Sequence, residues 1–389
     1  QFEKIPLSQE RVENSITKEI NELIAAQNSI QESGSSKGNR FSIRQIEEVK
    51  KRLQKRLQNL QDKPRDPTIE FENLGVDRLY VDEAHYYKNL FAYTKLSNVA
   101  GVSTTDAGKT SDMYEKCKYL NEKTNEKGIV FATGTPVSNS MVELYTMMRY
   151  LQPKRLQDAG LEAFDSWAMQ YGETATGFEL KPEGKGFQKK TRFANFHNLP
   201  ELMAMFKEVA DIKTKDVLDL KVPEAEFVVE ECKCTEEQRA MVNDLAERSD
   251  RIHKGGVDPS VDNMLKITSE GKKLALDQRL INPGLPDDPN SKVNCCVKNV
   301  FNIYEKTQAT KRTQLILCDQ SNPGPGFNVY QDIKDKLIKN GVAENEIAFI
   351  HDAPNEKQKA ALFAKVKSGS VRVLIGSTAM MGTGTNVQD

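Results

Sequence analysis

Two consecutive carboxylates and a histidine follow a short apolar run near residue 80. The run covers residues 79–81 and has the composition of a buried strand, and Asp82, Glu83 and His85 come within four residues of its end. A strand end holds its side chains on rigid backbone, so Asp82 could bind Mg²⁺ and Glu83 could polarise an attacking water. This order favours a site that hydrolyses a nucleoside triphosphate, and an ordinary solvated strand end is the alternative.

A second apolar run, over residues 128–132, ends in the sequence Thr-Gly-Thr-Pro at residues 133–136. It has the pattern of a buried strand that leads into a polar loop. Apolar residues then recur at helical spacing from Met141 to Leu151. This spacing predicts an amphipathic helix whose apolar stripe faces a core.

A third apolar run, over residues 371–375, leads into Ser377 and Thr378 and then into Gly382 and Gly384. Glycines at such a place let backbone amides approach a phosphate or a ribose closely. A plain turn at the start of a helix is the other reading of these glycines.

The three segments, in this order, resemble motifs II, III and V of superfamily-two helicase-like ATPases, and more narrowly the Swi/Snf type of double-stranded DNA translocase. The acidic motif is a DEAH box at residues 82–85. Other segments that resemble this family's pattern are Lys88-Asn89, residues 133–136 with Asn139 and Glu143-Leu144, Leu151 to Pro153, residues 213–217, 235–238, 263–267, 282–283, 314–319 and 349–358.

This resemblance implies ATP and Mg²⁺ as cofactors and DNA, expected to be double-stranded, as the partner. Asp82 would coordinate Mg²⁺ and Glu83 would orient the hydrolytic water. His85, Thr133 and Thr135 would couple the state of the nucleotide to DNA contact, although a hydrogen-bonded histidine at a strand end is the plainer reading of His85.

In the second half of the chain, the resemblance implies that Ser377 and Thr378 touch the phosphates of the DNA backbone. It also implies that Gly382 and Gly384 approach the nucleotide. In the family the nucleotide lies between two lobes and the DNA lies across both.

Two elements of a working motor are missing from the expected places. No Gly-x-x-x-x-Gly-Lys-[Ser/Thr] loop precedes Asp82, and the arginine motif of the family would lie beyond Asp389. Gly108-Lys109-Thr110 follows the acidic motif instead of preceding it, so Lys109 is expected to be a solvated loop residue. The sequence therefore resembles the middle part of a motor, with the phosphate loop and the arginines expected in the remainder of a larger polypeptide.

The expected fold is α/β, with two RecA-like lobes, both truncated, with helical insertions and an N-terminal helical hairpin. Apolar spacing predicts two helices in the hairpin, joined by a flexible connector over residues 34–39. The expected domains are the hairpin at 1–66, the first lobe at 67–222 and the second lobe at 223–389. Alternating helices and strands from residue 293 to 375 predict a parallel sheet flanked by helices.

Two segments near the expected boundary at residues 222–223 carry further expectations. Residues 177–192 contain lysines and an arginine among glycines and predict an exposed basic loop or a disordered linker. The apolar residues 227–229 are expected to begin a strand.

Composition limits the class of protein. The 389 residues carry a net charge of −1, so any DNA contact must be local, and the 38% hydrophobic content is enough for two or three domains with cores. No apolar run is long enough for a membrane span, and a cytoplasmic location is expected. The six cysteines lack paired metal spacing and are expected to be reduced.

Three functional hypotheses remain. In the first, the chain is part of an ATP-dependent DNA translocase and is inactive alone. In the second, it is a motor-derived module that binds DNA or protein without turnover. In the third, Lys109 binds phosphate in an unrelated NTPase. A wider resemblance to the large methylase-helicase polypeptides of phages and conjugative elements suggests a setting in DNA defence or transfer.

Overall fold

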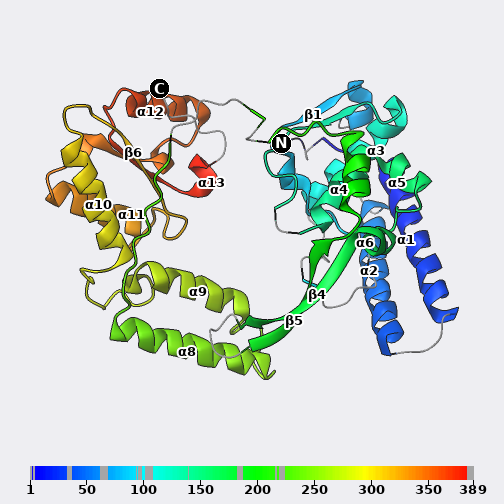
Figure 1. Cartoon of the computed structure of the whole chain (residues 1–389), viewed down its shortest axis with the longest axis horizontal. Helices are drawn as coiled ribbons and strands as arrows, with labels where there is room; N and C mark the ends of the chain where they lie inside the picture. The colour runs from blue at the N-terminus through cyan, green and yellow to red at the C-terminus, as the bar shows by residue number, and fades with distance from the viewer. Residues whose placement is uncertain are drawn as a thin grey trace. The chain divides into compact units, whose positions relative to one another are not determined.

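The computed structural model (Figure 1) divides the chain into two compact units, which are described separately. The first unit comprises Gln1–Leu180 and Phe187–Lys221, and the second comprises Lys181–Gly186 and Val222–Asp389. The structure describes residues 2, 5–32, 37–61, 69–92, 94, 99–100, 108–138, 140–181, 187–214, 217–218 and 224–382. The expected boundary at residues 222–223 lies outside these ranges. Both units mix helices with small sheets that contain parallel strands, so the fold is α/β.

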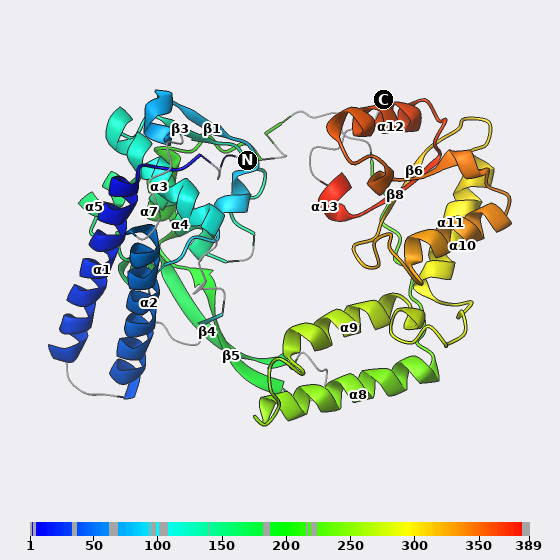
Figure 2. The same cartoon turned by 180° about the vertical axis from the view of Figure 1, so that it is seen from behind.

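The N-terminal helices α1 (Gln9–Glu32) and α2 (Lys37–Gln61) lie side by side in both views (Figures 1 and 2). Their facing stripes bury a small apolar core, as the spacing predicts. The expected connector is too long, because α2 already begins at Lys37 and therefore includes Gly38 and Asn39. The core residues of this pair are Ile16, Ile20, Leu23, Ile46 and Leu53.

The acidic segment follows β1 (Leu79–Val81), which pairs in parallel with β3 (Ile129–Phe131). Both strands are where the sequence predicts them. The 3₁₀ turns at Phe71–Leu74 and Ala84–Tyr87 flank β1. The helices that follow in this part of the unit are α3 (Gly108–Thr124), α4 (Val142–Leu151), α5 (Pro153–Asp158), α6 (Phe164–Tyr171) and α7 (Leu199–Lys207).

The expected basic loop at residues 177–192 is instead part of an antiparallel hairpin of β4 (Gly172–Leu180) and β5 (Phe187–Phe196). The short strand β2 (Val99–Ala100) pairs in parallel with β5. The prediction was wrong because cross-strand contacts, which composition does not reveal, hold the segment. The hydroxyls of Thr176 and Thr191 lie 2.9 Å apart, and Phe193 packs edge-on against Phe164 in the core at 5.8 Å between ring centroids.

The second unit contains a three-stranded parallel sheet with β8 (Val373–Gly376) in the centre, between β6 (Gln314–Leu317) and β7 (Ile347–Phe349). The predicted alternation of helices and strands is confirmed. The helices of this unit are α8 (Glu236–His253), α9 (Met264–Leu276), α10 (Lys292–Lys306), α11 (Val329–Lys339), α12 (Glu356–Lys367) and α13 (Thr378–Met381), with 3₁₀ turns at Gln278–Leu280, Glu344–Glu346 and Ile350–Asp352.

Side-chain caps explain why these helices begin where they do. Thr235 and Gln238 form a reciprocal capping box at the start of α8, and Asn263 caps α9. The expected strand from Phe227 is absent, because residues 224–235 pair with no other strand among the described residues and the Phe227 side chain is 92% exposed. Within the described ranges, none of the helices has the length and apolar composition of a membrane span.

Candidate functional site

The parallel pairing of β1 and β3 brings two of the predicted motifs together. The carboxyl ends of parallel strands lie at the same edge of a sheet, so the residues after Val81 and after Phe131 are neighbours. Backbone hydrogen bonds join the two segments directly. The amide of Ala132 donates to the carbonyl of Val81 at 2.9 Å, and the amide of Ala84 donates to the carbonyl of Ala132 at 3.0 Å.

The two carboxylates differ in their surroundings. Asp82 is exposed, and its Oδ1 accepts a hydrogen bond from the Glu83 amide at 2.8 Å. Glu83 is half-buried and has left-handed backbone angles, φ 52° and ψ 44°. A non-glycine residue in this conformation carries a strain of about 1–3 kcal/mol, and such strain concentrates at functional sites. The exposed oxygens of Asp82 suit Mg²⁺, which prefers carboxylate and water ligands.

His85 connects the acidic motif to the Thr-Gly-Thr-Pro segment. Its Nδ1 lies 3.1 Å from Thr133 Oγ1 and 3.1 Å from Glu83 Oε2. The Thr135 amide also donates to Thr133 Oγ1, at 3.1 Å. Four of the predicted site residues, Glu83, His85, Thr133 and Thr135, therefore form one connected group, which includes Asp82 through the Glu83 amide.

A nearly buried ion pair next to the loop after β3 was not predicted as part of the site. Lys88 Nζ lies 3.1 Å from Glu143 Oε2, and the two side chains are only 10% and 6% exposed. The same carboxylate accepts from the Ser138 amide at 2.6 Å, and Lys88 also hydrogen-bonds the Ser138 hydroxyl. Lys88 and Glu143 both lie in segments that resemble the family pattern, which was the signal available in the sequence. Asn139, between them in that pattern, lies outside the described residues.

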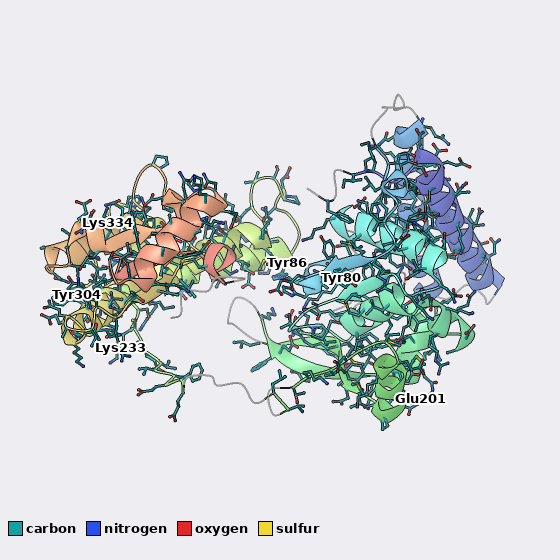
Figure 3. All side chains as sticks on the ribbon, turned by 90° about the horizontal axis from the view of Figure 1, so that it is seen from above. Tyr80, Tyr86, Glu201, Lys233, Tyr304 and Lys334 are labelled. Carbon is teal, nitrogen blue, oxygen red and sulfur yellow. The ribbon has the colours of Figure 1, made fainter. Side chains whose placement is uncertain are left out.

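Two exposed aromatic side chains lie next to residues of this group in the chain. Tyr80 in β1 is 67% exposed and Tyr86 is 50% exposed, and Figure 3 labels both in the first unit. The His85 and Tyr86 rings lie 4.6 Å apart. Lys109 is in the first turn of α3 and not in a loop, and its Nζ lies 5.3 Å from the centre of the Tyr86 ring.

The predicted residues of the second unit form a separate group at the carboxyl ends of β6 and β8. Asp319 accepts from the Thr378 amide at 2.7 Å and from the Thr378 hydroxyl at 2.9 Å. Ser377 is buried, with 7% of its surface exposed. Thr378 is exposed, and a partner could therefore reach its hydroxyl. An acceptor on that partner would compete with Asp319 for the hydroxyl proton.

Gly382 ends the short helix α13, where its amide donates to the Thr378 carbonyl at 2.7 Å. A Cβ at this position would lie 2.5 Å from that carbonyl oxygen, so the close approach requires glycine. Gly384 lies outside the described residues, as do Lys215 and Asp216 of the basic segment that resembles the family.

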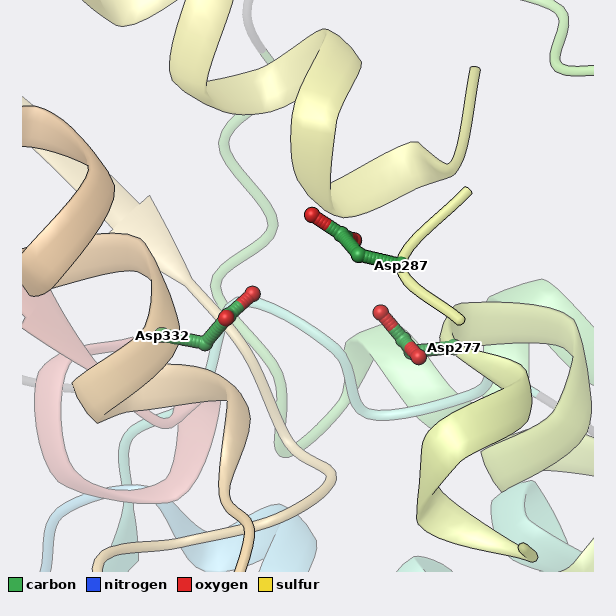
Figure 4. A group of neighbouring side chains, drawn as sticks. All are labelled: Asp277, Asp287 and Asp332. Carbon is green, nitrogen blue, oxygen red and sulfur yellow. The ribbon is translucent and has the colours of Figure 1, made fainter. Parts of the chain in front are cut away.

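One group of carboxylates in the second unit has the geometry of a cation site (Figure 4). Oxygens of Asp277, Asp287 and Asp332 all lie within 4.8 Å of one another. Arg279 Nη2 is 2.7, 3.0 and 2.8 Å from them in that order, and Lys336 pairs with Asp287 and Asp332. Two protein cations therefore already offset most of the charge of the three carboxylates, and the cluster links the end of α9, the loop before α10, and α11. The six cysteines are free thiols.

A parallel sheet that joins an acidic strand end to a Thr-Gly-Thr-Pro segment is the arrangement expected of a helicase-like protein. A family model described as "probable helicase domain" matches residues 1–214, more than half of the chain, and the chain belongs to this family. It is similar to Defense against restriction protein B of Escherichia phage P1, with 30% identity over 198 residues. That alignment covers 49% of this chain and only 9% of the phage protein, so the chain spans less than a tenth of its relative.

Proposed function

We propose that the chain is part of an ATP-dependent DNA translocase of the Swi/Snf type, built on two RecA-like lobes. Membership of the helicase family supports this proposal, and the order of the motifs supports the narrower type. The observation that carries it is the contact between the DEAH box and the Thr-Gly-Thr-Pro segment. His85 touches both Glu83 and Thr133, so a change at the carboxylate can move the loop after β3.

Each residue of the group has a role in this proposal. Asp82 would hold Mg²⁺, and the bound ion would neutralise charge on the ATP phosphates. Glu83 would accept the proton of the attacking water. Its left-handed backbone and its contact with His85 hold the carboxylate in position for this role. The ion pair of Lys88 and Glu143 would hold the loops after β1 and β3 in position.

The proposal places the phosphate loop and the arginine motif in other parts of a larger polypeptide. Charge-stabilising groups in phosphoryl transfer contribute ~10³-fold or more to the rate, so the 389-residue chain alone would hydrolyse ATP poorly. In the second unit, Ser377 and Thr378 would contact DNA and Gly382 and Gly384 the nucleotide. The phage relative is named for defence against restriction, and we extend that setting, the protection of mobile DNA, to the protein that carries this chain.

Steady-state ATP hydrolysis with and without duplex DNA tests the proposal, in this chain and in a longer chain that adds both missing elements. We expect DNA-stimulated hydrolysis in the longer chain alone, with Glu83→Gln lowering kcat by about 10²–10⁴-fold because it removes the general base. Lys109→Ala is the matched control and leaves the rate unchanged. The motor proposal fails if both chains are silent but bind DNA, an outcome that favours the non-catalytic binding module. Loss of nucleotide binding in Lys109→Ala, with none in Asp82→Ala, would favour the unrelated NTPase.

A further inference from the structure

The β4–β5 hairpin has two chemically different faces. Register and alternation place Thr176, Phe178 and Leu180 on one face, with their partners Thr191, Lys189 and Phe187. The 2.9 Å contact between the hydroxyls of Thr176 and Thr191 agrees with this assignment. We call this the aromatic face. The opposite face carries Glu179 and Arg192, which pair with each other, and also Gln188 and Lys190.

The aromatic face is partly buried at one end and exposed at the other. Near the body of the unit it includes Phe193, which packs against Phe164 in the core. Farther along, Phe178 is 78% exposed, Leu180 57% and Phe187 68%. Figures 1 and 2 show the two strands running out from beside α6 as a long ribbon. Large apolar side chains that cluster at the surface in this way mark a binding surface more often than an accident of packing.

Positive charge accompanies these aromatic rings. Lys189 lies directly opposite Phe178, on the same face. Residues 172–196 contain five lysines and arginines and three glutamates, a net charge of +2, whereas the whole chain carries −1. The Glu179 carboxylate on the other face is bound by Arg192, whose hydrogen bond lowers the pKa of Glu179. On the aromatic face, an anionic partner would therefore meet Lys189 beside exposed aromatic rings.

We propose that the aromatic face of the β4–β5 hairpin binds single-stranded DNA, with unpaired bases stacked on Phe178 and Phe187 and a backbone phosphate at Lys189. Aromatic rings interleaved with cations are how proteins hold single strands without sequence preference, because every base offers a flat face. In a duplex the bases are stacked on one another, so no base face is free to stack on the phenylalanine rings. The choice of DNA rests on the proposed function, but the preference for unpaired strands goes beyond it. It makes this hairpin the part of the protein that holds an opened strand.

Fluorescence anisotropy tests this with the 389-residue chain and no nucleotide, so that a failure of the ATPase proposal does not affect the result. The probes are a mixed-sequence single strand of about 16 nucleotides and the blunt duplex of the same sequence. We expect Phe178→Ala with Phe187→Ala to weaken single-strand binding by about 5–150-fold for each stacked base and to leave duplex binding unchanged. An unchanged single-strand affinity, or an equal loss on the duplex, overturns the proposal.

Two matched controls distinguish binding at this site from non-specific binding. Phe227→Ala removes another exposed phenylalanine, 92% exposed and outside the hairpin, and should leave single-strand affinity unchanged. Lys189→Ala and Lys190→Ala remove neighbouring lysines on opposite faces. Only Lys189→Ala should lower the salt dependence, by about 0.7 in the slope of log affinity against log salt for one lost phosphate contact.

Circular dichroism checks that each variant keeps its fold, and these exposed positions should tolerate alanine. Size-exclusion chromatography identifies the competing occupant. If the double phenylalanine variant changes its elution volume but binds single strands as before, the face mediates contact between copies of the chain, and the proposal is wrong.

Discussion

The strands β1 and β8 both deliver predicted site residues at their carboxyl ends, but their surroundings differ. All four residues of β8 are buried, and strands pair with it on both sides. In the two-stranded sheet of the first unit, β1 pairs with β3 and with no other strand in the described part of the chain. Of its three residues Val81 is buried, while Tyr80 is 67% exposed and its partner Val130 45%. Parallel sheets are ordinarily covered on both faces, so the first unit must hold its site by other means.

Polar contacts supply part of that support. In the first unit, the contact between His85 and Thr133 joins the loops after β1 and β3, and the ion pair of Lys88 with Glu143 joins the loop after β1 to the start of α4. In the second unit, the sheet core fixes the strand ends, and Asp319 and Thr378 join the loops after β6 and β8. The comparison therefore predicts that polar substitutions disturb the first site most and apolar truncations the second.

The largest effect is expected from Lys88→Met. Removing one partner of a buried ion pair costs about 3–5 kcal/mol. Urea unfolding followed by tryptophan fluorescence measures this loss of stability in the first unit, because the single tryptophan, Trp167, is buried there. Lys109→Met, at an exposed position, is the control and should change the midpoint little. Equal midpoints for the two variants would mean that the pair does not support the site.

Truncation in the middle of each strand sharpens the comparison further. Leu374→Ala in β8, at a fully buried position, should lower the stability of the second unit by about 2–5 kcal/mol because a cavity is left. Tyr80→Ala, at the middle of β1, should change the first unit by no more than about 0.5 kcal/mol. Hydrogen exchange of the β8 amides and Trp167 fluorescence report the two units separately. A large loss from Tyr80→Ala would show that the open face of β1 is covered in solution.

The sequence predicted those elements whose pattern is local. The strands at 79–81 and 129–131 are apolar runs bounded by polar loops, and α1 and α2 show apolar residues at helical spacing. The β4–β5 hairpin was missed because its glycines and lysines hide the alternation that the cross-strand register reveals. The Lys88–Glu143 pair was missed because it joins segments far apart in the chain, and the left-handed backbone of Glu83 leaves no signal in residue type.

Acid should affect one carboxyl group of each unit, Glu19 and Asp287, in opposite directions, which is the smallest of the expected effects. Glu19, on α1, is half-buried; burial and the nearby Glu115 raise its pKa above the ordinary 4.5, against the pull of Lys118, Arg149 and Arg56. The folded state then binds the proton more tightly than the unfolded state, so stability is greatest below 4.5 and falls as the pH rises through the raised pKa. Glu19→Gln should abolish this dependence in the Trp167 signal.

Asp287 in the second unit has the opposite sign. Burial opposes ionisation of its carboxyl, but Lys336 and Arg279 outweigh this and hold its pKa below the ordinary 3.8. The unfolded state then binds the proton more tightly, so the stabilisation is complete above 3.8 and is lost as the pH falls through the lowered pKa. The stability of the second unit can be measured by unfolding at a series of pH values, with hydrogen exchange of the β8 amides as the readout. The stability should fall in acid, and Asp287→Asn should reduce that fall. A loss of the same size in both proteins would assign the acid sensitivity to groups other than Asp287.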